Sequence, residues 1–128
     1  MKLFSVSPVG ILFIFGAIGY PLLELLWRGR THWSMALAGG ICMVLLLLIS
    51  RFPFPCPFLW LCGALAITGV EFAIGCVVNR WLHLGVWDYS ALPMNLWGQI
   101  SLPFSLLWFA LSIPGIALCR VIDQGLFG

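Results

Sequence analysis

The chain has 128 residues, of which 62% are hydrophobic and only 8% are charged. A soluble domain carries about 25% charged residues, and a small one buries only about 60–70% of its unfolded surface, so this composition excludes a water-soluble globule. Six Lys or Arg and four Asp or Glu give a formal net charge of +2, which excludes the basic patch of a nucleic-acid-binding protein. The composition predicts an all-α integral membrane protein.

The first hydrophobic segment runs from about Pro8 to Trp27 and has no charge before Glu24. A helix needs about 20 apolar residues to cross a bilayer core of about 30 Å, and this segment has that length. It is longer than the hydrophobic region of a signal peptide, about 7–15 residues, so we expect a retained helix. Glu24 lies four residues before Arg28, a spacing that favours an ion pair and leaves a role in a site open.

Two further segments are predicted to span the membrane. The second runs from Trp33 to Ser50 without a charge, and the third runs from about Phe58 to Asn79 and is interrupted only by Glu71. A polar turn over residues 28–32 precedes the second segment. A proline-rich turn over residues 51–57 separates the second from the third, because proline and the residue before it disfavour helix.

The segment from residue 80 to 101 reads RWLHLGVWDYSALPMNLWGQIS and is rich in aromatic residues, which suits the membrane–water boundary. Its length admits an interfacial or re-entrant segment. The fourth helix is expected from about Leu102 to Cys119, with Pro103 in its first turn, where a missing N–H costs little. We therefore predict a single transmembrane domain over residues 1–128, a bundle of about four helices, with both termini on the same side.

Glu71 is the strongest candidate for a functional residue, because an ionisable side chain within a membrane helix is costly and by default marks function. Residues on its helix face, by the 3–4 spacing, are small or polar: Ala64, Thr68, Gly75 and Asn79. The fourth helix has a similar face, formed by Ser101, Ser105, Trp108 and Ser112. Either these serines bond to their own helix, as is common in membranes, or the two faces form an inward polar seam. The second interpretation predicts a cavity centred on Glu71, with Asn79, Asn95 or a serine of the fourth helix close by.

The sequence offers little for metal or cofactor chemistry, and we expect neither. His32 and His83 fall in different loops without metal-ligand spacing. The five cysteines are scattered and are expected to be small packing residues. The chain contains no nucleotide-binding loop, so any nucleotide-driven activity needs a partner ATPase subunit. No catalytic residue can be assigned.

One string of residues is specific for so small a chain. It comprises Glu71-x-x-x-Gly75-x-x-x-Asn79, then Trp87-Asp88-Tyr89-Ser90, Pro93, Asn95, Gly98 and Ser105-x-x-Trp108. The string resembles the pattern of the type IV ABC-transporter membrane proteins known as CmpB. The resemblance implies a small multi-pass membrane protein and a set of candidate substrate-binding residues: Glu71, Asn79, Trp87, Asp88, Tyr89, Asn95, Ser105, Trp108 and, more loosely, Glu24. In that loop Asp88 is expected either to cap a turn or to pair with Arg80.

Three functions remain open. The leading hypothesis is a transport component of the cell membrane that binds a small polar solute or a lipid headgroup in the cavity beside Glu71. The alternatives are a membrane-embedded enzyme acting on a lipid or prenyl substrate, and a non-catalytic scaffold whose polar seam only holds helices together. The expected partner is the lipid bilayer, with a homo-oligomer or a partner membrane or ATPase subunit as open possibilities and no nucleic acid.

Overall fold

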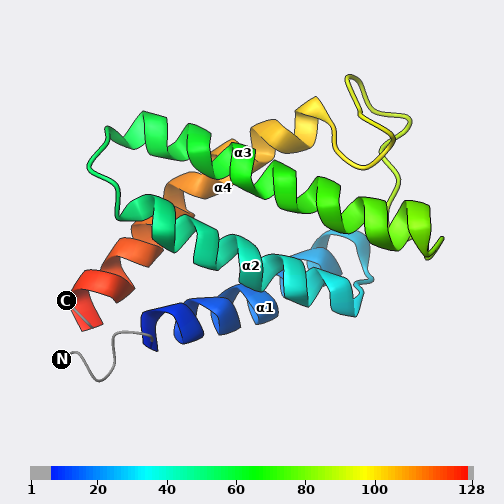
Figure 1. Ribbon diagram of the computed structural model, residues 1–128. Coiled ribbons are helices and arrows are strands. Elements are labelled where there is room, and N and C mark those ends of the chain that lie inside the picture. Colours follow the sequence, from blue (N-terminus) through cyan, green and yellow to red (C-terminus); the bar gives the residue numbers. More distant parts are fainter. Residues whose placement is uncertain (1–6, 127–128) are drawn as a thin grey trace.

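Four long helices make up most of the chain (Figure 1), and the computed structural model describes residues 7–126. The helices are α1 (Ser7–Arg28), α2 (Trp33–Ser50), α3 (Cys56–Gly75) and α4 (Leu102–Arg120). A wide π-helical turn prolongs α3 (η2, Cys76–Trp81), and another prolongs α4 (η3, Val121–Leu126). With these turns, all four are long and apolar enough to cross a membrane. The expectation of an all-α protein with four spans is confirmed.

The ends of the third and fourth spans differ from those expected. The fourth continues beyond Cys119, its expected end, because η3 prolongs it to Leu126. The third differs at both ends. It begins at Cys56 rather than Phe58, because Pro57 occupies the first turn, where proline is tolerated. It ends at Trp81 rather than Asn79, because the chain widens into the π-helical turn η2 instead of stopping. Such turns are rare and occur frequently at functional sites. Here the turn carries Asn79 and Arg80 at the base of the following loop.

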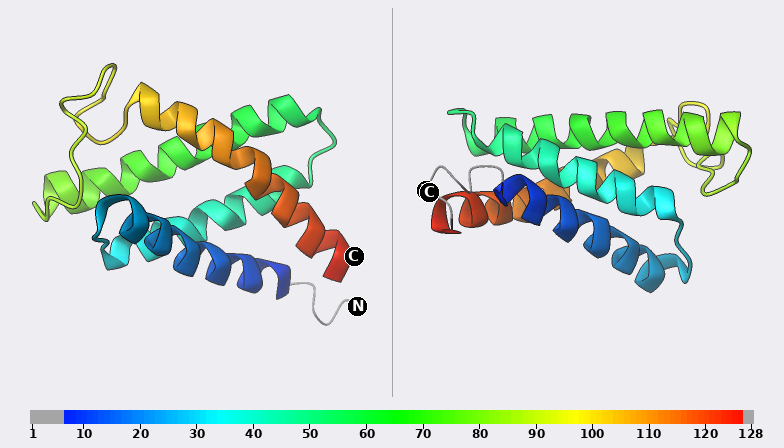
Figure 2. Two further views of the ribbon diagram at one scale, coloured as in Figure 1. Left: turned by 180° about the vertical axis from the view of Figure 1, so that it is seen from behind. Right: turned by 60° about the horizontal axis from the view of Figure 1, so that its bottom comes forward.

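The four helices do not all contact one another to the same extent. α2, α3 and α4 pack against one another, whereas α1 lies along α2 (Figures 1 and 2). Gly16 and Gly39 allow this close approach, since a Cβ on Gly16 would lie 2.0 Å from the carbonyl oxygen of Gly39. Small residues serve the same purpose at helix contacts in membranes generally. The remaining surface of α1 is left to face either lipid or the interior of the bundle.

The two ends of the helix bundle, which would lie on opposite sides of a membrane, differ in what they carry. The start of α1 and the end of η3 lie at the same end of the bundle (Figure 2), as an even number of spans requires. Arg51, in the turn between α2 and α3, donates two hydrogen bonds of 2.9 Å to the carboxylate of Asp123 at this end. A buried cluster, which includes Leu12, Leu47 and Cys119, closes the core here.

The loop from Leu82 to Ser101 lies at the opposite end of α4 and joins it to η2 (Figure 1). Its backbone is irregular, with positive φ at Gly85 (62°) and Gly98 (71°). A Cβ on Gly98 would also lie 2.7 Å from the carboxylate of Asp88. This loop occupies the place expected for an interfacial segment and begins two residues later than predicted, because η2 takes up Arg80 and Trp81.

Candidate functional site

Glu71 is buried inside the bundle and fixed by two aromatic side chains. Its residue surface is 8% exposed. The Tyr89 hydroxyl donates to one carboxylate oxygen at 2.8 Å, and Trp108 Nε1 donates to the other at 3.1 Å. These donors come from the loop and from α4, so one carboxylate joins three parts of the chain.

Within residues 7–126, Glu71 has no cationic partner. The two ion pairs in this part of the chain are Arg28–Glu24 and Arg51–Asp123. A carboxylate has about four acceptor positions, and the two hydrogen bonds to Glu71 occupy half of them. Buried charges are normally paired, so an unpaired carboxyl with spare acceptor capacity is unusual.

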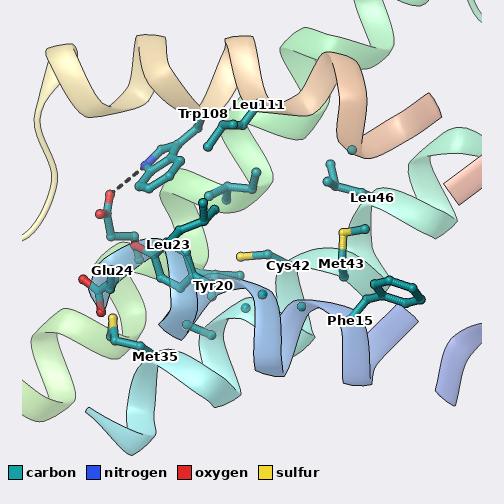
Figure 3. Close-up of a pocket in the computed structure, with 18 of the residues that line it drawn as sticks. Phe15, Tyr20, Leu23, Glu24, Met35, Cys42, Met43, Leu46, Trp108 and Leu111 are labelled. Carbon is teal, nitrogen blue, oxygen red and sulfur yellow. Dashed lines mark hydrogen bonds between the residues drawn. The ribbon is translucent and has the colours of Figure 1, made fainter. Parts of the chain in front are cut away.

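A cavity of about 340 Å³ lies beside Glu71. Its walls come from all four helices and from the loop, with α1 and α2 on one side and α3 and α4 on the other (Figure 3). Small residues, among them Gly16, Gly19 and Ala38, form part of the wall, and their size leaves the space open. The volume falls within the range of small-molecule sites, about 300–1,000 Å³.

The two ends of the cavity differ in chemistry. Tyr20, Glu24 and Trp108 gather at one end with the Glu71 carboxylate, whereas Phe15, Met43 and Leu46 lie at the other (Figure 3). Most of the remaining lining is aliphatic. The arrangement can therefore hold a group with a polar head and an apolar body.

Aromatic rings surround the polar end. Tyr20 of α1 meets Trp108 of α4 edge to face, with ring centroids 6.0 Å apart. Trp87 and Tyr89, from the loop, complete this wall, and Trp87 Nε1 donates to the carbonyl oxygen of Gln99 at 2.9 Å. Trp87 is therefore buried between the loop and the bundle (6% exposed).

The Tyr89 hydroxyl remains a hydrogen-bond donor. Burial, reinforced by the nearby Glu71 carboxyl, raises the pKa of Tyr89 above the ordinary value of a tyrosine. A neutral phenol keeps the proton that it donates to Glu71, so the contact between loop and bundle persists at neutral pH. The ring of Tyr89 also stacks on Phe104 of α4, with centroids 4.5 Å apart.

Glu24 forms the ion pair that its spacing to Arg28 favours, and it also lies at the candidate site. Its carboxylate pairs with Arg28 at 3.2 Å and accepts a hydrogen bond from the Thr31 hydroxyl at 3.1 Å. The same residue lines the cavity. Arg28 also donates to the carbonyl oxygen of Val86 at 3.2 Å, so the ion pair ties the end of α1 to the loop.

Asn79 binds the backbone and a side chain of the loop and does not line the cavity. Its side-chain oxygen accepts from the backbone N–H of Val86 at 2.6 Å and of Trp87 at 3.3 Å, and its amide donates to Gln99 at 2.8 Å. None of these hydrogen bonds goes to the Glu71 carboxylate, and the expectation that Asn79, Asn95 or a serine of the fourth helix lies close to Glu71 stays a prediction. Asn79 instead positions Trp87, which lines the cavity.

Asp88 and Asn95 likewise act within the loop. Asp88 accepts a hydrogen bond from the backbone N–H of Ser90 at 2.9 Å and so caps a turn. Arg80 does not pair with Asp88; its guanidinium lies over the Trp97 ring, 4.8 Å from the ring centroid. Asn95 donates to the Leu92 carbonyl at 2.9 Å. Neither residue hydrogen-bonds to Glu71, so the structure does not bring these two candidates into the cavity.

The serines of α4 have structural partners. Ser105 hydrogen-bonds to Thr68 across the helix pair at 3.0 Å. Ser112 donates to the Trp108 carbonyl at 2.8 Å and packs against Gly63. The interpretation that a helix serine bonds its own backbone is therefore correct for Ser112, while Thr68–Ser105 is a polar contact between helices.

Sequence reasoning missed Tyr20, which lies beside Trp108 at the polar end of the cavity. A signal for it was present, because Gly16, Tyr20, Leu23 and Glu24 follow the 3–4 spacing of one helix face. All four line the cavity. Gln99, the partner of Asn79 and Trp87, was missed because an irregular loop has no periodic pattern.

Comparison with known proteins identifies the family. Neither curated proteins nor solved structures give a significant match to the chain. The family described as "Putative ABC-transporter type IV" (CmpB) matches residues 11–126. This match covers most of the first span, the other three spans and the loop that carries the aromatic residues beside Glu71. The chain belongs to this family of multi-pass membrane proteins, as the string from Glu71 to Trp108 indicated.

Proposed function

We propose that this protein is a transport component of the cell membrane that binds a small polar solute or a lipid headgroup in the cavity beside Glu71. The observation that carries the proposal is a buried carboxyl without a cationic partner in the described residues, held by Tyr89 and Trp108 at the wall of a 340 Å³ cavity. Ionisable residues in such positions mark substrate or ion pathways in membrane proteins. The family description points to transport as well.

A scaffold accounts less well for the cavity. The contacts that a scaffold needs are already made by the Thr68–Ser105 hydrogen bond and by the close packing of Ser112 against Gly63. Glu71 adds the cost of a buried carboxyl beside open space, and a well-packed apolar residue would avoid this cost. A ligand-binding role gives the carboxyl and the space a common purpose.

Native mass spectrometry of the protein released from its own membranes tests the proposal, because it detects a bound molecule of any identity. The matched control is Gly19→Leu, because a Cβ on Gly19 meets no atom within 4 Å and the residue lines the cavity. The added side chain fills the space without disturbing the contact between α1 and α2. We expect a bound molecule on the wild-type protein that is absent or depleted on Gly19→Leu. Identical bound masses on the two proteins would contradict the proposal.

A further inference from the structure

The polar end of the cavity combines aromatic rings with carboxyl groups. Tyr20, Trp87, Tyr89 and Trp108 line this end, and they come from three separate parts of the chain. The π-face of an aromatic ring attracts a cation, and cages of such rings are used to bind quaternary ammonium groups. A wall of this composition is suited to a cation that has lost part of its hydration shell.

The carboxyl groups add to this preference. Glu24 and Glu71 both line the cavity, whereas the guanidinium of Arg28 pairs with Glu24 alone. One carboxyl at this end therefore lacks an opposite charge in the described residues. A cationic ligand would supply that charge, while an anion would meet a carboxyl that no cation offsets.

The remainder of the cavity sets the size and character of the ligand's body. Phe15, Met43 and Leu46 form the end away from Glu71 (Figure 3), and Ile67 and Leu118 also line the space. An apolar cavity of about 150 Å³ is known to hold benzene, so a volume of 340 Å³ leaves room for a ring and a substituted head group.

We propose that the ligand is an amphipathic organic cation, an amine or quaternary ammonium head on an apolar body the size of one or two aromatic rings. The head would lie between Glu71 and the aromatic wall, and the body would lie against Phe15, Met43 and Leu46 at the apolar end. This inference rests on the proposed function, because it names the class of molecule that the same cavity binds. The shared chemistry is a cationic head group, whether on a free solute or on a lipid.

Two isosteric probes test the charge preference directly. Benzyltrimethylammonium and neopentylbenzene have the same shape, because a quaternary nitrogen in the first replaces a quaternary carbon in the second. Binding of each to the purified full chain in neutral maltoside micelles is measured by equilibrium dialysis, with protein-free micelles subtracted. Three variants accompany the wild type: Glu71→Gln, Gly19→Leu and Asp123→Asn. The last removes a carboxylate at the other end of the bundle, where it pairs with Arg51.

We expect the wild type to bind the cation at least about tenfold more tightly than the neutral isostere, since a desolvated cation–π contact and a carboxylate together exceed a tenfold effect. Glu71→Gln should lose most of this preference, and Asp123→Asn should keep it. Gly19→Leu should bind neither probe. Equal binding of the two probes by the wild type would overturn the inference without requiring any variant to fold.

The outcomes separate this inference from the proposed function. If both probes bind equally and Gly19→Leu abolishes both, the cavity binds ligands but does not select cations. If Gly19→Leu leaves the binding of both unchanged, the cavity is not the site and both proposals fail. Added phosphatidylcholine distinguishes the two sources of the cation. Competition with benzyltrimethylammonium assigns a lipid headgroup, and no competition assigns a free solute.

Discussion

Replacement of Glu71 by leucine or by glutamine separates hydrogen bonding from charge. Leucine removes the acceptor for Trp108 Nε1 and for the Tyr89 hydroxyl. A buried donor left without a partner costs about 1–3 kcal/mol, and hydrogen bonds measured within a membrane protein average about 0.6 kcal/mol with a maximum near 1.7. Trp108 is 5% exposed, so water cannot readily replace its lost acceptor, whereas the Tyr89 hydroxyl can turn towards the cavity. We therefore expect Glu71→Leu to lower the free energy of unfolding by about 1–3 kcal/mol.

Glutamine should preserve most of this stability. Its side-chain oxygen can accept from Trp108 Nε1, and its amide can donate to the oxygen of Tyr89, since a phenol both donates and accepts. We expect Glu71→Gln to change the free energy of unfolding by less than about 1 kcal/mol. It should nevertheless abolish a function that depends on the charge.

The assay is reversible unfolding in mixed micelles, followed by circular dichroism, with wild type, Glu71→Leu and Glu71→Gln compared at one detergent concentration. A difference of about 1.4 kcal/mol shifts the folding equilibrium tenfold, which such a titration resolves. Glu71→Leu equal in stability to wild type would refute the reasoning, because the carboxylate would then not hold Tyr89 and Trp108. A large loss in Glu71→Gln would show that charge, rather than hydrogen bonding, maintains the fold.

Three further predictions concern the helix contact, the loop and the phenol. Gly16→Ala should destabilise the protein by about 1–3 kcal/mol in the same titration, because the methyl group would overlap α2, whereas Gly19→Ala should not, since its Cβ meets open space. Asn79→Ala should speed hydrogen exchange across residues 82–101 at least about tenfold, because three hydrogen bonds are lost, and Asp88→Ala should have a smaller and more local effect. Equal exchange in the two variants would contradict this. Burial raises the pKa of Tyr89 in the folded protein. The stability that the neutral phenol contributes is therefore complete below the pKa of a tyrosine in the unfolded chain, about 10, and is lost as the pH rises above that value. Tyr89→Phe should therefore lose less stability than wild type between about pH 8 and pH 11, and equal losses would contradict the shift.

Hydrophobicity alone was sufficient to predict the four spans. Most of their bounds agree within two residues, because apolar runs of membrane length leave the chain no other structure in lipid. The largest error is at the end of the fourth span, where the π-helical turn η3 continues past Cys119 to Leu126, and a smaller one is at the end of the third, where η2 continues past Asn79 to Trp81. Nothing in the local sequence marks such a turn, since it depends on loop groups that Asn79 binds.

The candidate site was predicted in part. The burial of Glu71 follows from the cost of a carboxyl in a membrane helix, and the face of α4 that carries Trp108 follows from helix periodicity; the contact between the two was not predicted. The roles of Asn79 and Asn95 could not be predicted, because the path of an irregular loop depends on side-chain hydrogen bonds and on positive φ at residues such as Gly98. Tyr20 was recoverable from the pattern of α1 but was overlooked in favour of Glu24.

The native cysteine Cys42 provides the most direct test of the central claim, that a ligand-accessible and cation-selective cavity lies beside Glu71. Cys42 lines this cavity (Figure 3). In a protein whose other four cysteines are replaced by alanine, its rates of modification by a cationic and an anionic methanethiosulfonate are compared. Each rate is first divided by the rate of the same reagent with a free thiol in solution.

The account predicts that Cys42 reacts in the folded protein, and that the cationic reagent is faster after this correction. The ratio should fall towards one in Glu71→Gln, and benzyltrimethylammonium should protect the thiol in the protein that retains Glu71. A ratio that Glu71→Gln leaves unchanged, or a thiol that benzyltrimethylammonium fails to protect, would contradict the account.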